Sequence, residues 1–114
     1  LGQAQRACVA RALIARPRLL LCDEPLSALD APAQRRVAAL IDAARRESGA
    51  ACLVVTHDLG YAAAHADRVA VLREGRVVET APAAAFFAAP ASDYGRALRD
   101  AAAALGALAS REAA

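Results

Sequence analysis

The clearest indication of the fold in this sequence is Leu19-Leu20-Leu21-Cys22-Asp23-Glu24-Pro25. It opens with an apolar run, and a proline stands shortly before and after that run. A short apolar run between such turn signals predicts a strand that is buried on both faces, as in a parallel sheet. We place this strand at residues 18–22. The carboxylates of Asp23 and Glu24 follow side by side, where the strand leaves the sheet.

Helix and strand patterns alternate on either side of this stretch. Residues 3–15 are good helix formers, and the apolar residues of 30–48 recur at helical spacing behind a capping aspartate, Asp30. Residues 51–55 form a second apolar strand, and Asp58 begins another short helix. This alternation predicts an α/β fold in which a parallel sheet is flanked by helices.

The C-terminal part of the chain follows a different pattern. Two β-rich runs on either side of Arg73-Glu74-Gly75 predict a hairpin over residues 67–80. The composition then shifts toward alanine, and residues 94–109 predict a final helix. We therefore divide the chain into a main domain, residues 1–82, and a C-terminal helical extension, residues 83–114.

Composition narrows the classes of protein. The chain has 114 residues, of which 14 are basic and 12 acidic, for a net charge of +2. Every basic residue is an arginine, so this chain supplies no lysine for a phosphate-binding P-loop. No apolar run approaches the roughly 18 residues of a membrane span. The three cysteines, Cys8, Cys22 and Cys52, form no CxxC pair, and we expect them to be buried thiols rather than zinc ligands or a disulfide.

The paired carboxylates are the first candidate site. An ionised carboxylate at the end of a buried strand is costly unless a metal ion or hydrogen bonds compensate it. Open α/β sheets also bind their ligands at the carboxyl ends of strands. A magnesium-bound nucleotide accounts for both acids, because one can hold the metal while the other orients or deprotonates a water. The structural alternative is that both acids are capped, or paired with arginines.

Three neighbouring motifs favour the interpretation that the two acids serve a magnesium-bound nucleotide. Leu1-Gly2-Gln3-Ala4-Gln5-Arg6 opens the first helix, Leu26-Ser27-Ala28-Leu29-Asp30 follows the acidic pair, and Thr56-His57-Asp58 ends the second strand. This order resembles the ATP-binding-cassette (ABC) ATPase family, in which a signature loop, a Walker B strand, a D-loop and a switch histidine follow one another. The resemblance covers almost the whole chain and implies part of a P-loop NTPase fold, with ATP and Mg²⁺ as cofactors.

The resemblance implies a role for each matched residue. Asp23 takes the place of the Walker B aspartate, which binds Mg²⁺ mostly through water. Glu24 takes the place of the catalytic carboxylate that polarises the attacking water. His57 takes the place of the switch histidine, which contacts the γ-phosphate.

Four further residues match motifs that face a second subunit. Ser27 and Asp30 correspond to the D-loop, which joins the two active sites of a dimer. Gly2 and Gln3 correspond to the end of the signature, which closes over nucleotide bound to the opposite subunit. The signature is incomplete here, because its serine is absent. Since the P-loop is also missing, we expect the 114-residue chain alone neither to bind ATP tightly nor to hydrolyse it.

The last third of the chain points to a subgroup. Glu79-Thr80, Phe86-Phe87-Ala88-Ala89-Pro90 and Tyr94-Gly95-Arg96-Ala97-Leu98 resemble the C-terminal extension of importer ATPases for oligopeptides, dipeptides and nickel. This resemblance implies a bacterial ATPase on the cytoplasmic face of the inner membrane. Its partners would be a second ATPase subunit, membrane permease subunits and, indirectly, a substrate-binding protein, with no nucleic acid. The other interpretation of this segment is a generic terminal helix that packs on the core.

Two other functions stay open at this point. The chain could be a piece of a soluble ABC ATPase that acts in DNA repair or translation. It could also be a truncated, non-enzymatic remnant that only docks to an intact subunit.

Overall fold

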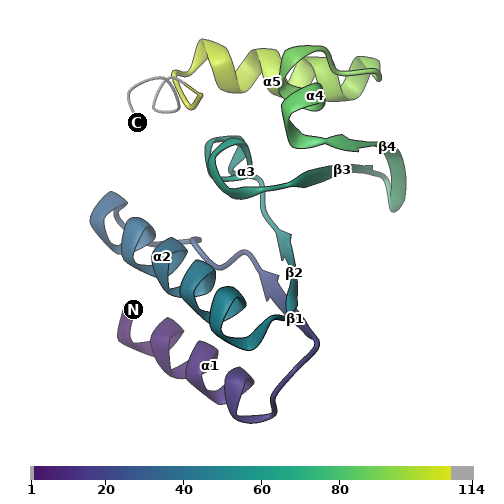
Figure 1. Ribbon diagram of the computed structural model, residues 1–114. Coiled ribbons are helices and arrows are strands. Elements are labelled where there is room, and N and C mark those ends of the chain that lie inside the picture. The colour runs from purple at the N-terminus through teal and green to yellow at the C-terminus, as the bar shows by residue number, and fades with distance from the viewer. Residues whose placement is uncertain (1, 109–114) are drawn as a thin grey trace. The chain divides into compact units, whose positions relative to one another are not determined.

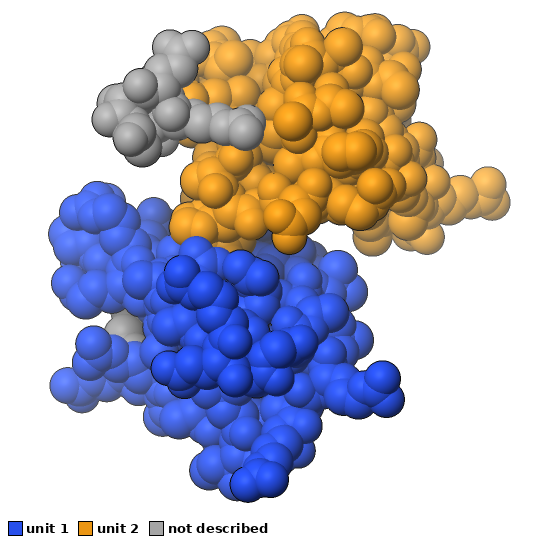
Figure 2. All heavy atoms as spheres, in the orientation of Figure 1, with its two compact units in different colours: residues 1–57 blue, residues 58–114 orange. Residues whose placement is uncertain are grey.

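The computed structural model describes residues 2–108 of the chain. They belong to two compact units, residues 1–57 and residues 58–114, which Figure 2 shows in different colours. The boundary that we predict between residues 82 and 83 lies inside the second unit and stays a prediction. Within residues 2–108, every helix falls short of the combined length and apolarity that a membrane span requires.

The first unit contains the predicted parallel strands. Its elements are α1 (Gly2–Ile14), β1 (Leu19–Asp23), α2 (Ala31–Ser48) and β2 (Ala51–Val55), in the order that the sequence predicts. Strand β1 pairs with β2 in parallel, from Leu19 opposite Ala51 to Asp23 opposite Val55. The strands therefore end level with each other, and the residues that follow them emerge at one edge.

Helices α1 and α2 cover one face of this two-stranded ribbon (Figure 1). The core on that face contains Leu20 of β1 together with Ala44 and Ala50, and partly buried side chains pack against it: Val9, Leu13 and Cys52. The amphipathic helix α2 buries one stripe along its length: Ala33, Val37, Ala38, Ile41 and Ala44. Burial of this stripe holds α2 against the rest of the unit.

The opposite face of the ribbon is open, and our expectation of strands buried on both faces is wrong for this chain. Leu19, Leu21, Leu53 and Val55 are between 51% and 70% exposed. The reason is that both helices of the unit lie on the same side of the strands (Figure 1). Apolar runs are typical of strands covered on two sides, but within residues 2–57 the helices cover these strands on one side only.

The second unit is a hairpin covered by helices. Its elements are α3 (Leu59–His65), β3 (Arg68–Arg73), β4 (Arg76–Pro82), α4 (Ala83–Ala88) and α5 (Asp93–Ala104). The predicted hairpin is confirmed: β3 and β4 are antiparallel, and the two-residue turn has positive φ at Glu74 and Gly75. Both positions of such a tight turn favour residues that tolerate left-handed backbone. Phe86 of α4 is only 2% exposed and is the largest fully buried side chain of residues 2–108.

Candidate functional site

The site is built where β1 and β2 end. Asp23 is the last residue of β1 and lies opposite Val55, the last residue of β2. The N–H of Glu24 donates to the carbonyl oxygen of Val55 at 2.7 Å, which extends the ladder by one residue. His57 follows two residues after Val55. The strand pairing therefore brings Asp23, Glu24 and His57 to one edge of the ribbon, as the sequence predicts for neighbouring parallel strands.

Glu24 and His57 are in direct contact. The Nδ1 atom of His57 lies 3.0 Å from Oε1 of Glu24, which is a hydrogen bond when either group supplies the proton. The side chain of His57 is 82% exposed and that of Glu24 is 37% exposed. Solvent or a ligand can therefore reach both groups. A carboxylate within hydrogen-bond reach of a water can act as a general base toward it.

The backbone of Glu24 is unusual for its residue type. Its φ is +49°, in the left-handed region that favours glycine. Its carbonyl oxygen accepts from the N–H of Ser27 at 3.2 Å, so the chain turns immediately after the strand. Non-glycine residues in this conformation cost about 1–2 kcal/mol and gather at functional sites. The turn directs the Glu24 side chain toward His57 instead of along the strand.

The oxygen ligands present fit Mg²⁺ bound to a nucleotide. Asp23 places an exposed carboxylate beside Glu24. Among residues 2–108, no cluster of three or more histidine, cysteine or acidic side chains could hold a metal ion by itself. Mg²⁺ is usually held by one or two carboxylates together with waters and substrate phosphates, not by a protein cage. Asp23 and Glu24 therefore suit Mg²⁺ that arrives with phosphates.

The predicted D-loop residues lie on the turn that leads into α2. Leu26 is buried and anchors this turn, while Ser27 and Asp30 are exposed. Asp30 has a structural role as the N-cap of α2, because its Oδ1 atom accepts from the N–H of Ala33 at 2.8 Å. Ala28, between them, has a φ of +62°. Glu24 and Ala28, two non-glycine residues with left-handed backbone, thus lie within one turn.

The predicted end of the signature forms the start of α1. Gly2 and Gln3 are in its first turn, and Gln3 is exposed. Leu1, the first residue of that motif, lies outside the described residues.

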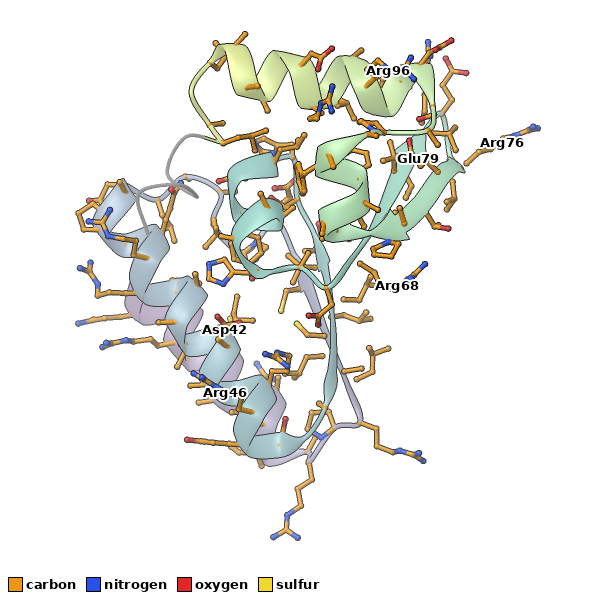
Figure 3. All side chains as sticks on the ribbon, turned by 45° about the horizontal axis from the view of Figure 1, so that its top comes forward. Asp42, Arg46, Arg68, Arg76, Glu79 and Arg96 are labelled. Carbon is orange, nitrogen blue, oxygen red and sulfur yellow. The ribbon has the colours of Figure 1, made fainter. Side chains whose placement is uncertain are left out.

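A carboxylate in the second unit is a feature that sequence reasoning missed. Glu79 of β4 is 8% exposed and accepts three hydrogen bonds: from the N–H of Ala91 at 2.7 Å, the N–H of Ser92 at 2.9 Å and the hydroxyl of Ser92 at 2.6 Å. The Ser92 hydroxyl, and then the two N–H groups, hold the pKa of Glu79 below its usual range. Figure 3 shows Glu79 and, on the neighbouring helix α5, Arg96. Glu79 thus ties the hairpin to the start of α5.

The prediction for the cysteines is wrong in one case. Cys8 of α1 is exposed, whereas Cys22 and Cys52 are partly buried. All three are free thiols. Cys8 lies just before Val9, which packs against the core, so it is turned away from that face.

Comparison with known proteins finds relatives that are named as ATP-binding proteins of transporters. No protein-family model matches the chain. The methionine import ATP-binding protein MetN of Mesorhizobium japonicum is 46% identical over 97 residues, which are 85% of this chain and 27% of that protein. The oligopeptide transport ATP-binding protein OppD of Haemophilus influenzae is 40% identical over 100 residues, which are 88% of this chain and 31% of that protein. The chain thus spans less than a third of the length of either relative.

A solved structure agrees with these relatives. The ATP-binding cassette MJ0796, in a dimeric post-hydrolysis state bound to ADP and Pi, superposes with a TM-score of 0.61 at 34% sequence identity. The match covers 72% of this chain and 35% of that one. The α/β fold with its parallel strands is therefore part of the P-loop NTPase fold of ABC ATPases. With relatives at 40–46% identity along most of its length, the chain belongs, as a segment, to the family of ABC transporter ATP-binding proteins.

Proposed function

We propose that this chain is the water-activating part of an ATP-hydrolysing subunit of an ABC importer. The observation that carries the proposal is the contact between Glu24 and His57, 3.0 Å apart, beside the Asp23 carboxylate. Phosphoryl transfer to water asks the protein for positioning and charge stabilisation more than for covalent chemistry. An exposed acid, a histidine and a metal-binding carboxylate at one strand edge supply these functions.

Each of the three side chains has a distinct task in this proposal. Glu24 orients the attacking water and accepts its proton, a role that contributes about 10²–10⁴-fold to rate. His57 contacts the γ-phosphate and stabilises the charge that develops there. Asp23 holds Mg²⁺, mostly through water. The metal, when bound, neutralises charge on the phosphate oxygens.

The remaining predicted residues act toward a second subunit. Ser27 and Asp30 lie on an exposed turn next to Glu24, where a D-loop joins the two sites of a dimer. Gly2 and Gln3 open α1, where the N–H groups of a helix start can bind phosphate of nucleotide on the opposite subunit. The dimeric state of the ATP-binding cassette MJ0796 supports this arrangement.

We infer the transported substrate, the location and the partner subunits from the resemblance to importer ATPases. The subunit would lie on the cytoplasmic face of a bacterial inner membrane, bound to permease subunits that receive substrate from a binding protein. Relatives named for methionine import and oligopeptide transport support a transport role. The short helix α4 and the capped helix α5 after the hairpin favour the peptide and nickel subgroup, which the sequence of residues 79–98 resembles.

A chimeric subunit tests this proposal. The chain would replace the matching 97-residue segment of the methionine import protein of Mesorhizobium japonicum. We expect Mg²⁺-dependent ATP hydrolysis, and we expect Asp23→Asn to raise the Mg²⁺ concentration needed for half-maximal rate. Asp67→Asn, at an exposed position between α3 and β3, is the matched control. A folded chimera that binds ATP without hydrolysing it would contradict the proposal.

A further inference from the structure

The chain between β1 and α2 is held at its start, its middle and its end. At the start, the N–H of Glu24 donates to the carbonyl oxygen of Val55 at 2.7 Å. At the end, Asp30 caps α2. In the middle lies Leu26, whose side chain is only 7% exposed. Residues 24–30 therefore form one loop that is anchored to both the strands and the helix.

The carbonyl oxygen of Leu26 receives two hydrogen bonds. The N–H of Leu29 donates to it at 3.4 Å, which closes a turn within the loop. The Nε2 atom of Gln34 also donates to it at 3.4 Å. A carbonyl oxygen has two lone pairs and can accept both bonds. Gln34 belongs to α2 and its side chain is half-buried. Gln34 therefore ties the middle of the loop to the helix.

The loop depends on such a tie because its backbone is strained at two positions. Glu24 has a φ of +49° and Ala28 has a φ of +62°. A non-glycine residue keeps a left-handed backbone only where the surrounding structure holds it there. Leu26 lies between these two residues, so the bond from Gln34 acts where the strain is concentrated. Without this bond the loop can relax, and the carboxylate of Glu24 then spreads over more positions around its contact with His57.

We propose that Gln34 is a positioning residue for ATP hydrolysis, because it holds the loop that carries Glu24. This inference rests on the proposed function, in which Glu24 accepts the proton of the attacking water. Gln34 acts through the carbonyl of Leu26 and then through the turn in which the N–H of Ser27 donates to the carbonyl oxygen of Glu24 at 3.2 Å. A general base must lie within hydrogen-bond reach of the proton that it takes. A looser loop should therefore slow the chemical step and leave ATP binding unchanged.

The test uses the chimeric subunit. Gln34→Met keeps the length of the side chain and removes the donor. We expect unchanged ATP affinity and single-turnover hydrolysis that is about 3-fold to 10-fold slower, the rate equivalent of one neutral hydrogen bond. Gln34→Glu also loses the donor, suits the N-terminal part of a helix, and should slow hydrolysis by a similar factor. Arg35→Met, at the next and exposed position of α2, is the matched control and should keep the unmodified rate.

A double-mutant cycle separates positioning from a general loss of structure. In a Glu24→Gln background, Gln34→Met should slow hydrolysis no further, because the group that Gln34 positions no longer takes a proton. Amide hydrogen exchange gives a second measurement that does not depend on activity. The N–H groups of Ser27 and Leu29 donate within the loop, so both should exchange faster in Gln34→Met and at the unmodified rate in Arg35→Met.

Three results would overturn the inference. If Gln34→Met hydrolyses ATP at the unmodified rate while Glu24→Gln is slow, Gln34 has no part in positioning and the proposed function stands. If Gln34→Met slows hydrolysis equally in both backgrounds, it acts on something other than Glu24, and again the proposed function stands. If Glu24→Gln itself leaves hydrolysis unchanged, the proposed function fails and this inference fails with it.

Discussion

The Oε1 atom of Glu24 lies 3.0 Å from Nδ1 of His57, although 33 positions separate the two residues in the sequence. Two features produce this contact. The parallel register ends β1 and β2 at the same level, with Asp23 opposite Val55. The left-handed backbone of Glu24 then turns its side chain across to the neighbouring strand. The strand pairing and this turn therefore hold the acid and the histidine together.

Asp30 is predicted to stabilise α2 as its N-cap. Asp30→Ala removes the side-chain acceptor for the N–H of Ala33, and we expect a loss of about 1 kcal/mol in the free energy of unfolding. Asp30→Asn keeps an N-cap and should leave stability nearly unchanged, because asparagine caps as well as aspartate. Urea denaturation of both variants checks this. Equal stability of the alanine variant and the unmodified chain would show that the cap contributes nothing.

The hydrogen bonds that Glu79 accepts from Ala91 and Ser92 should make the stability of the second unit depend on pH. Hydrogen bonds from Ser92 and Ala91 lower the pKa of Glu79 in the folded chain, compared with about 4.3 in an unfolded one. Its ionised form therefore stabilises the fold above about pH 4.3, and this contribution is lost as the pH falls toward the lower folded pKa. We expect the thermal midpoint to fall between about pH 6 and pH 3.

Two glutamate variants test whether Glu79 causes this dependence of stability on pH. Glu79→Gln places an amide N–H₂ among donors and removes the charge, so stability should fall at neutral pH and depend less on acid. Glu74→Gln, at the exposed hairpin turn, is the matched control and should keep the full pH dependence. If both variants respond to acid as the unmodified chain does, Glu79 does not produce the effect.

Gly95 is predicted to be a packing requirement of α5. A Cβ atom there would crowd the Glu79 carboxylate and would lie 2.8 Å from Oγ of Ser92 and 3.1 Å from Cε1 of Phe86. Alanine is the better helix former by roughly 1 kcal/mol, yet we expect Gly95→Ala to lower the free energy of unfolding by about 1–3 kcal/mol. Denaturation measures this. In a Glu79→Ala background, the cost of Gly95→Ala should be smaller, because the carboxylate that a Cβ atom would crowd is gone. A Gly95→Ala variant that is more stable than the unmodified chain would contradict the crowding.

The open face of the β1–β2 ribbon predicts self-association. Leu21 is 70% exposed and Leu53 is 54% exposed on paired strands, each of which has one unpaired edge within residues 2–108. Exposed apolar strands of this kind tend to pair with other chains. We expect the 114-residue chain to sediment as oligomers, and Leu21→Thr with Leu53→Thr to shift it toward monomer. Leu20→Thr, on the covered face, should unfold the unit instead of dispersing it. A chain that is monomeric at all concentrations would contradict this prediction.

The order of the elements and the position of the acidic pair could be predicted because they depend on local patterns. Apolar runs, the capping residue Asp30 and the turn at Glu74 and Gly75 each act over a few residues. The open face at Leu21 could not be predicted, since it depends on which elements cover the strands. The left-handed backbone of Glu24 was also invisible, because glutamate rarely adopts it. Likewise, the contacts of Glu79 join residues 12 and 13 positions apart through packing alone.

Glu24→Gln in the chimeric subunit tests whether this glutamate activates the attacking water. Glutamine keeps the size of the side chain but cannot accept the proton of the attacking water. ATP binding should be unchanged, and single-turnover hydrolysis should slow by about 10²–10⁴-fold. Glu47→Gln, an exposed glutamate near the end of α2, is the control and should hydrolyse ATP at the unmodified rate. Unchanged hydrolysis in Glu24→Gln would exclude this residue as the general base.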